Sequence, residues 1–206
     1  MANNPNKVRF TIDNVHYAPL TETVGTGGAV TYSYGTPVHV PGTSNLDLSA
    51  EGDMTPWRAD GIDYYIGQSN DGYSGDWENA IFPDSMLTDI WGMVLDSTSK
   101  TILETANAVA KDFALMFRVR GDKFKRDFVL YRCSAGRPNV GSSGSSGSAE
   151  VQPQSVSITA RARGDGKIKC CTTADTPAAV VAGWYTSVFE EYTPDPDPDP
   201  DPEPVG

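Results

Sequence analysis

Alternation of apolar and polar residues recurs along the chain and predicts many short β-strands. Over 45–51, Leu46, Leu48 and Ala50 alternate with polar residues, and over 72–81 Trp77 shares one strand face with its apolar neighbours while Asp76 falls on the other. The remaining segments with a strand pattern are 8–12, 29–34, 38–40, 62–66, 113–119, 128–133, 156–163 and 168–170. Many short strands joined by turns favour a β-sandwich or barrel.

Glycine-rich turns join several of these segments. Gly121 with the two residues after it predicts a hairpin between 113–119 and 128–133. The turn at 163–167 likewise predicts that 168–170 returns beside 156–162. Residues 35–37 interrupt the strand-rich stretch from Ala29 to Val40. The turns at 121–123 and 163–167 therefore predict two hairpins.

Two short helices complete the expected fold, which is mainly β with α (α+β). Pro83 ends the strand over 72–81 and opens a helix that continues to Trp91, with Gly92 as its stop. A C-terminal helix is expected over 176–189, with Asp175 or Thr176 as its cap. Its apolar stripe should pack on a sheet. The stripe consists of Val180, Val181, Trp184 and Val188.

Composition divides the chain of 206 residues into one domain and one appendage. The domain is expected over 1–193, with a flexible Gly-Ser loop at 141–148, and an acidic, proline-rich tail follows over 194–206. Loop and tail should be dispensable for folding, because neither can bury apolar area. No apolar run approaches the roughly 18 residues of a membrane span. The first residues lack a secretory signal pattern, so we expect folding in the cytoplasm of the producing cell, with all three cysteines reduced.

The net charge of −11 is unevenly distributed. Residues 1–100 sum to −9, residues 101–189 to +5 and residues 190–206 to −7. Basic residues concentrate on one expected hairpin, for which an acidic neighbouring subunit is the expected partner. They are Arg118, Arg120, Lys123, Lys125, Arg126 and Arg132.

Candidate chemistry is sparse, and we expect no enzyme, no cofactor and no metal site. His16 and His39 stand on strand patterns without a nucleophile motif, and Cys170 and Cys171 lack a second pair for zinc. Residues 25–28 lack the Lys of a phosphate-binding loop. Asp76 and Glu78 lie two apart without the pocket of a carboxylate pair. The pattern favours a structural role.

Three segments together resemble one protein family. They are the opening 7–22, the stretch 36–48 and the strand-to-helix stretch 72–92. Over about residues 7–192 the chain resembles the major tail protein, or tail tube protein, family of long-tailed bacteriophages. The resemblance implies a structural virion protein that forms stacked hexameric rings around a channel for genome delivery. It also implies a β-sandwich or barrel whose strands join a ring-wide inner barrel, with a helix packed outside.

The resemblance further implies partners and a location. Copies of the chain itself, tape-measure and terminator proteins are the expected partners, and phage DNA should pass without specific binding. The tail of the virion is the expected location, after assembly in the bacterial cytoplasm and without membrane contact.

Two sets of residues are candidates for these roles. An acidic lining would keep DNA from adhering, because like charge prevents contacts that release counterions. The lumen candidates are Asn45, Asp47, Ser49, Glu51, Ser74, Asp76 and Glu78. A solvated outer sheet face is the alternative interpretation of the same pattern. The stretch 52–61 is expected to connect two strands and to dock one ring on the next. Its contact candidates are Met54, Pro56, Trp57 and Arg58, with Trp57 as anchor.

Two other functions are compatible with the same sequence. A tube protein of a phage-tail-like bacteriocin or of a secretion system would share the fold but carry no genome. A carbohydrate-binding β-sandwich would use exposed aromatic rings as a stacking platform. Its candidate residues are Trp57, Tyr64, Tyr65 and Tyr73.

Overall fold

A computed structural model describes residues 6–144 and 151–191 and is mainly β, as expected. Its helices are α1 (Asp84–Asp89) and α2 (Ala178–Gly183). Its strands are β1 (Arg9–Val24), β2 (Val30–Tyr34), β3 (Val38–His39), β4 (Thr43–Glu51), β5 (Met54–Ala59), β6 (Ile62–Gln68), β7 (Gly72–Asn79), β8 (Val94–Leu95), β9 (Ile102–Leu103), β10 (Phe113–Gly121), β11 (Lys125–Ala135), β12 (Gln154–Ala160) and β13 (Lys169–Cys171).

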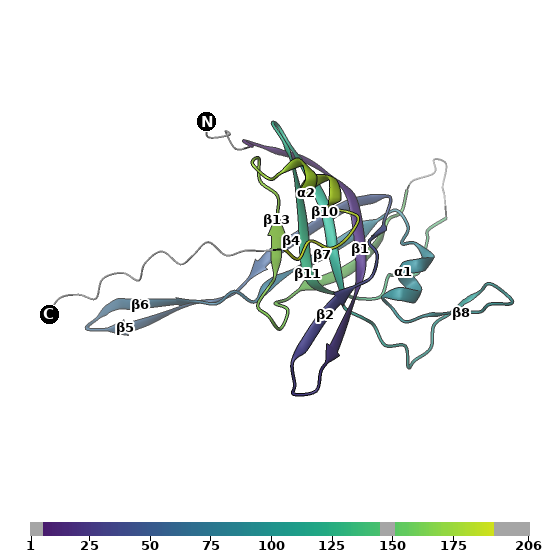
Figure 1. Cartoon of the computed structure of the whole chain (residues 1–206), viewed down its shortest axis with the longest axis horizontal. Helices are drawn as coiled ribbons and strands as arrows, with labels where there is room; N and C mark the ends of the chain where they lie inside the picture. Colours follow the sequence, from purple (N-terminus) through teal and green to yellow (C-terminus); the bar gives the residue numbers. More distant parts are fainter. Residues whose placement is uncertain (1–5, 145–150, 192–206) are drawn as a thin grey trace.

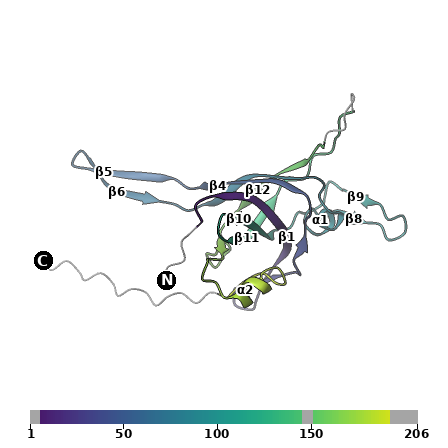
Figure 2. The ribbon, with the colours of Figure 1, turned by 90° about the horizontal axis from the view of Figure 1, so that it is seen from above.

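Nine strands form one antiparallel sheet in the order β2-β1-β10-β11-β12-β7-β4, with β3 beside β1 and β13 beside β11. The sheet curls so that β4 approaches the first half of β1, as Figures 1 and 2 show. A cleft of about 540 Å³ lies there, between residues such as Phe10 and Leu46. No ladder joins β1 to β4. The sheet of a single chain is therefore not closed into a barrel.

The core has two parts, one on each face of the β1–β10–β11 layer. The larger part fills the concave side, where Trp77 and Trp91 are fully buried and α1 adds Met86. The smaller part lies on the other side, where α2 and the residues after it cover Ala114, Met116 and Val129. β10 is therefore buried on both faces over its first half, which explains its continuous apolar run.

Helix α1 ends at Asp89, two residues before the expected end at Trp91. Gly92 has a φ of +67°, and the Met93 N–H donates to the Leu87 carbonyl. Glycine adopts this left-handed conformation without strain, so the chain turns away at Gly92, just beyond the end of the helix.

The expected C-terminal helix over 176–189 is too long. Helix α2 covers only 178–183, Pro177 is its N-cap, and no side chain caps it. The Thr176 hydroxyl accepts a hydrogen bond from the Thr173 N–H at 2.8 Å instead of capping the helix. Gly183 has low helix propensity and a β-branched residue follows at Thr186, so the helix ends early. Trp184 and Val188 still become buried, through irregular backbone.

Two expected connections also differ from the structure. Residues 54–59 are not a loop but strand β5, which pairs with β6. The turn at 163–167 forms, with the Arg163 N–H donating to the Lys167 carbonyl at 2.9 Å. The strand after it, β13, does not return along β12 but pairs with the middle of β11. The residues of the turn determine that the chain reverses direction at 163–167. Strand β13 then pairs with β11 because β12 occupies only residues 133–135 of β11 and leaves residues 128–130 free.

Candidate functional site

All seven lumen candidates lie on one face of the neighbouring strands β4 and β7. The register places Asn45 opposite Glu78, Asp47 opposite Asp76, and Ser49 opposite Ser74. Strand β12 extends this polar face, because its small polar residues lie opposite the same β7 positions. They are Ser155, Ser157 and Thr159. We call this three-strand surface the acidic face.

The opposite side of these strands faces the core. Leu46, Trp77 and Val156 form one row across the three strands and Leu48 packs behind them. A slip of one residue would turn this row outward and the carboxylates inward, so burial of Trp77 fixes the register. Trp77 Nε1 also donates to the Thr43 hydroxyl at 3.1 Å.

Negative charge on the acidic face is not balanced locally. Asp47 and Asp76 are directly opposite each other, an arrangement that is destabilising for like charges. In the described part of the chain no Lys or Arg forms an ion pair with Asp47, Asp76 or Glu78. Glu51 accepts a hydrogen bond from the Ser74 hydroxyl. This surface therefore presents an uncompensated negative potential.

Strands β5 and β6 form a two-stranded arm that projects away from the sheet (Figures 1 and 2). Its β5 strand carries all four candidates for contact between rings. Pro56 lies opposite Ile66 and Trp57 opposite Tyr65. Arg58 pairs with Asp63 across the ribbon, with 2.6 Å between Nε and Oδ1.

The arm exposes apolar side chains on both of its faces. Successive residues on β5, such as Pro56 and Trp57, point to opposite sides of the ribbon, and both sides carry large groups. Six large side chains of the arm are each more than half exposed, and they are Met54, Trp57, Ile62, Tyr64, Tyr65 and Ile66. The arm therefore has no inner face directed at its own core.

The aromatic residues of the carbohydrate alternative do not form one platform. Trp57 and Tyr64 make an edge contact at 5.8 Å between ring centroids on the arm. Tyr73 lies in the main sheet beside Ala50, and its ring and hydroxyl contact Lys169. Tyr73 follows Gly72, which pairs with Glu51, and Trp57 lies six residues beyond Glu51. Six residues of extended chain span about 20 Å, so Trp57 is far from Tyr73.

Half of the basic hairpin is paired within the chain, in contrast to the expectation of a neighbouring partner. Arg118 forms a bidentate pair with the buried Asp127, Arg120 pairs with Asp13, and Arg132 pairs with Asp112. The acidic first half supplies Asp13, so part of the charge asymmetry is neutralised inside one subunit. The other three cations, at the turn end of the hairpin, form no ion pair with any described residue.

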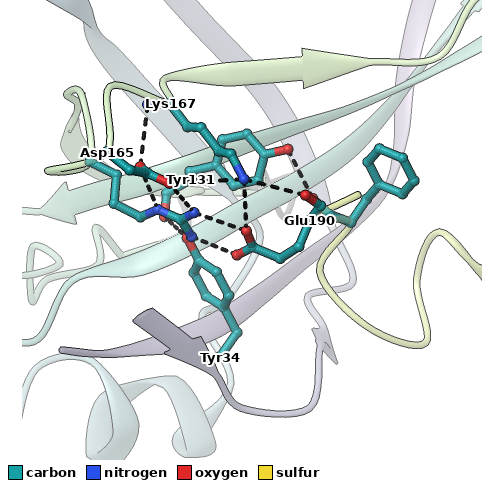
Figure 3. A network of polar contacts seen from close by, with 7 residues as sticks. Tyr34, Tyr131, Asp165, Lys167 and Glu190 are labelled. Atoms are coloured by element: carbon teal, nitrogen blue, oxygen red, sulfur yellow. Dashed lines mark hydrogen bonds and ion pairs between the residues drawn. The ribbon is translucent and has the colours of Figure 1, made fainter. Parts of the chain in front are cut away.

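A buried arginine holds the C-terminal segment in place (Figure 3). Arg163 is only 3% exposed, and its guanidinium contacts Asp165 at 2.6 Å and Glu190 at 2.5 Å. It also donates to the Tyr34 hydroxyl at 3.0 Å. Burial raises the pKa of Tyr34 to about 12, so the hydroxyl stays protonated and donates to the Tyr131 carbonyl. This arrangement ties strand β2, the 163–167 turn and the end of the domain together.

The sequence gives little indication of this cluster. Arg163 falls on the polar face of the pattern over 156–163, and its partner Glu190 is 27 residues away. Desolvation would raise the pKa of Glu190, but hydrogen bonds from Arg163 and Lys167 outweigh it and lower that pKa. Only the tertiary structure brings these groups together.

The histidines and the buried cysteine pack against other side chains of the fold. The rings of His16 and His39 contact each other across β1 and β3, and Tyr185 contacts His16. Burial raises the pKa of the Cys133 thiol. Among the residues that the structure describes, no three His, Cys, Asp or Glu side chains cluster as a metal site would require.

No protein-family model matches the chain, and a search of curated proteins finds no match. Within the described ranges, no helix is long and apolar enough to span a membrane.

Proposed function

We propose that the protein is the tail tube subunit of a long-tailed bacteriophage, forming stacked hexameric rings through which the genome passes. The observation that carries this proposal is the acidic face, an exposed row of carboxylates without basic partners on a curled sheet. A face of this kind reduces the stability of the isolated subunit, because Asp47 and Asp76 repel each other. A function that requires negative charge on this surface would explain why the chain carries such a face despite that cost in stability.

That role is to line a channel for DNA. Cationic surfaces bind DNA because each phosphate contact releases counterions, and carboxylates give no such gain. A wall that carries Asp47, Asp76 and Glu78 from every subunit repels the polyanion from all sides. DNA then moves along the channel without being held at any point.

Assembly into a ring would also resolve the open sheet. Strand β4 pairs only with β7 among the described strands, so its other edge is free. A free edge is a template for pairing with another chain, and a barrel shared by several subunits removes such edges. In this proposal neighbouring copies cover the edge of β4 and place the acidic face on the inside.

The arm supplies the contact between rings. A two-stranded ribbon without other support is at best marginally stable in water. Docking Trp57 and its neighbours into the adjacent ring would bury the apolar surface that the arm exposes on both faces. Trp57 is the expected anchor, since Trp is enriched among residues that dominate interface energies.

Electron microscopy of the purified protein tests this proposal. We expect rings with a central channel, and tubes at high protein concentration, with sedimentation reporting the assembled fraction. Tubes isolated in particles without a genome would point to a tail-like bacteriocin or secretion tube. A chain that stays monomeric at high concentration and binds glycans would exclude the tube function in favour of a carbohydrate-binding module.

A further inference from the structure

The arm combines exposed aromatic rings with an excess of negative charge. We define it as residues 53–68, in which Asp53, Asp60 and Asp63 outnumber the single Arg58, for a net charge of −2. Apart from Arg58 with Asp63, no ion pair of the described residues involves the arm. A partner for this surface should therefore offer apolar side chains and positive charge.

A second surface of the chain has this complementary character. Residues 7–10 and 122–126 lie side by side, because Arg9 is opposite Gly121 and the Lys7 N–H donates to Asp122 at 2.8 Å. We call this surface the basic tip. Its five cations and one carboxylate give a net charge of +4, and they are Lys7, Arg9, Lys123, Lys125, Arg126 and Asp122.

The basic tip also exposes apolar groups. Phe10 is 69% exposed, Val8 is about half exposed, and Phe124 lies beneath the Arg126 guanidinium at 5.7 Å. None of the five cationic side chains forms an ion pair with a described residue. The tip thus presents unpaired positive charge around accessible apolar surface. Its net charge is opposite in sign to that of the arm, and like the arm it exposes apolar side chains.

We propose that the arm of one copy docks on the basic tip of a copy in the adjacent ring. This inference rests on the proposed tube function and specifies its contact. The arm extends away from its own sheet, as Figure 2 shows, so it does not fold back on the tip of the same chain. Because the two surfaces differ, the contact is heterologous, and copies displaced along the tube axis can repeat it from ring to ring, as a growing tube requires.

Charge distinguishes the tip from the β8–β9 hairpin, which also exposes apolar side chains. The β8–β9 hairpin projects from the end of the molecule opposite the arm and exposes Val94 and Leu103. Over 94–111 it carries two acids and two bases, so its net charge is zero. It offers no electrostatic preference for an acidic arm, whereas complementary potentials at the tip would select partner and orientation.

Charge reversal on each side provides the test. Lys7→Glu, Lys123→Glu and Lys125→Glu together change the tip from +4 to −2. Asp53→Lys with Asp63→Lys changes the arm from −2 to +2. Each reversal alone should reduce tube mass by at least about tenfold while rings persist, and the combined variant should restore tubes. Tube growth of the unmodified protein should also weaken in about 1 M salt, where the Debye length is about 3 Å.

A cross-linking measurement identifies the contact directly. Carbodiimide joins carboxylates to amines without a spacer, so a mixture of ¹⁴N- and ¹⁵N-labelled full chain should yield mixed links between arm aspartates and tip lysines. Lys111→Glu, an exposed charge reversal away from both surfaces, is the matched control and should leave tubes intact. Tubes that tolerate both reversals and lack these links would overturn the inference and leave the tube function standing.

Two further outcomes are informative. If reversal of the tip abolishes tubes while reversal of the arm does not, the tip serves another partner and the inference is wrong. If the unmodified protein forms neither rings nor mixed links at high concentration, the tube function and this contact fail together.

Discussion

The sheet strands β4 and β7 and the arm strands β5 and β6 are two halves of one long antiparallel ribbon. The ladder continues between them, because the Asp71 N–H donates to the Glu51 carbonyl and the Ser69 N–H to the Asp53 carbonyl, each at 3.0 Å. Gly52 forms the joint with a φ of +151°, where a Cβ would lie 2.3 Å from the Ser69 carbonyl oxygen. Glycine is therefore required there.

The two halves differ in what supports them. Strand β7 has β12 on its other edge and Trp77 buried in the core, whereas the arm strands pair only with each other. In the sheet half, large apolar residues such as Leu46 and Trp77 occupy one face only, whereas in the arm large apolar groups occupy both faces. The backbone pairing is the same in both halves. The difference is that a further strand and the core stabilise the sheet half, whereas a strand pair without them is at best marginally stable in water.

Trp77→Ala should produce the largest effect, because it removes the support of the sheet half. Loss of a fully buried Trp is expected to lower the free energy of unfolding by about 3–5 kcal/mol, measured by urea denaturation. Trp57→Ala is the matched control in the arm and should change this free energy by less than about 0.5 kcal/mol. Equal losses for the two variants would mean that the halves are supported alike.

Trp57→Ala should instead impair assembly. If the arm becomes buried only between rings, loss of this anchor should weaken each contact by about 2 kcal/mol, which shortens tubes and lowers their yield. Tube length in micrographs and the sedimenting fraction provide the measurement. Val109→Ala, at an exposed apolar position outside the ribbon, is the control. Unchanged length and yield for Trp57→Ala would remove the anchor role.

Lysine at Asp47, Glu51, Asp76 and Glu78 should alter function without preventing folding, because none of these side chains is in the core. Tails built with this variant should look normal but deliver DNA poorly, since a basic channel holds phosphates. Added salt should ease the stalling by weakening those contacts. Normal delivery would place the acidic face outside the channel and remove the observation that carries the tube proposal, which would then depend on the assembly of rings and tubes alone.

Acid should loosen the segment held by Arg163. Hydrogen bonding to Arg163 lowers the pKa of Asp165 from 3.8 to about 2, so its stabilising effect is present above about pH 4 and lost as the pH falls toward 2. The effect should be small, because Asp165 is partly exposed and Glu190 also pairs with Arg163. Asp165→Asn should reduce the pH dependence of the urea midpoint in this range. An unchanged dependence would assign it to other carboxylates.

Much of the candidate site could be predicted from local pattern. A period of two along β7 is enough to place Asp76 and Glu78 on one side and Trp77 on the other, and the same period along β4 separates Asp47 from Leu46. The strand-to-helix stretch ending at Gly92 and the hairpin of β10 and β11 were equally local. Strand β5 was missed, because Pro56 and the loss of alternation are atypical of a strand.

The sequence by itself determined which residues share a strand face, where most turns lie and how charge divides along the chain. These properties depend on the period of the backbone and on the conformational limits of glycine and proline. Tertiary structure alone decided that β13 pairs with β11, that α2 ends at Gly183 and that Arg163 is buried between Asp165 and Glu190. Those outcomes depend on contacts between residues far apart in the chain, where packing space and desolvation select one of several locally permitted arrangements.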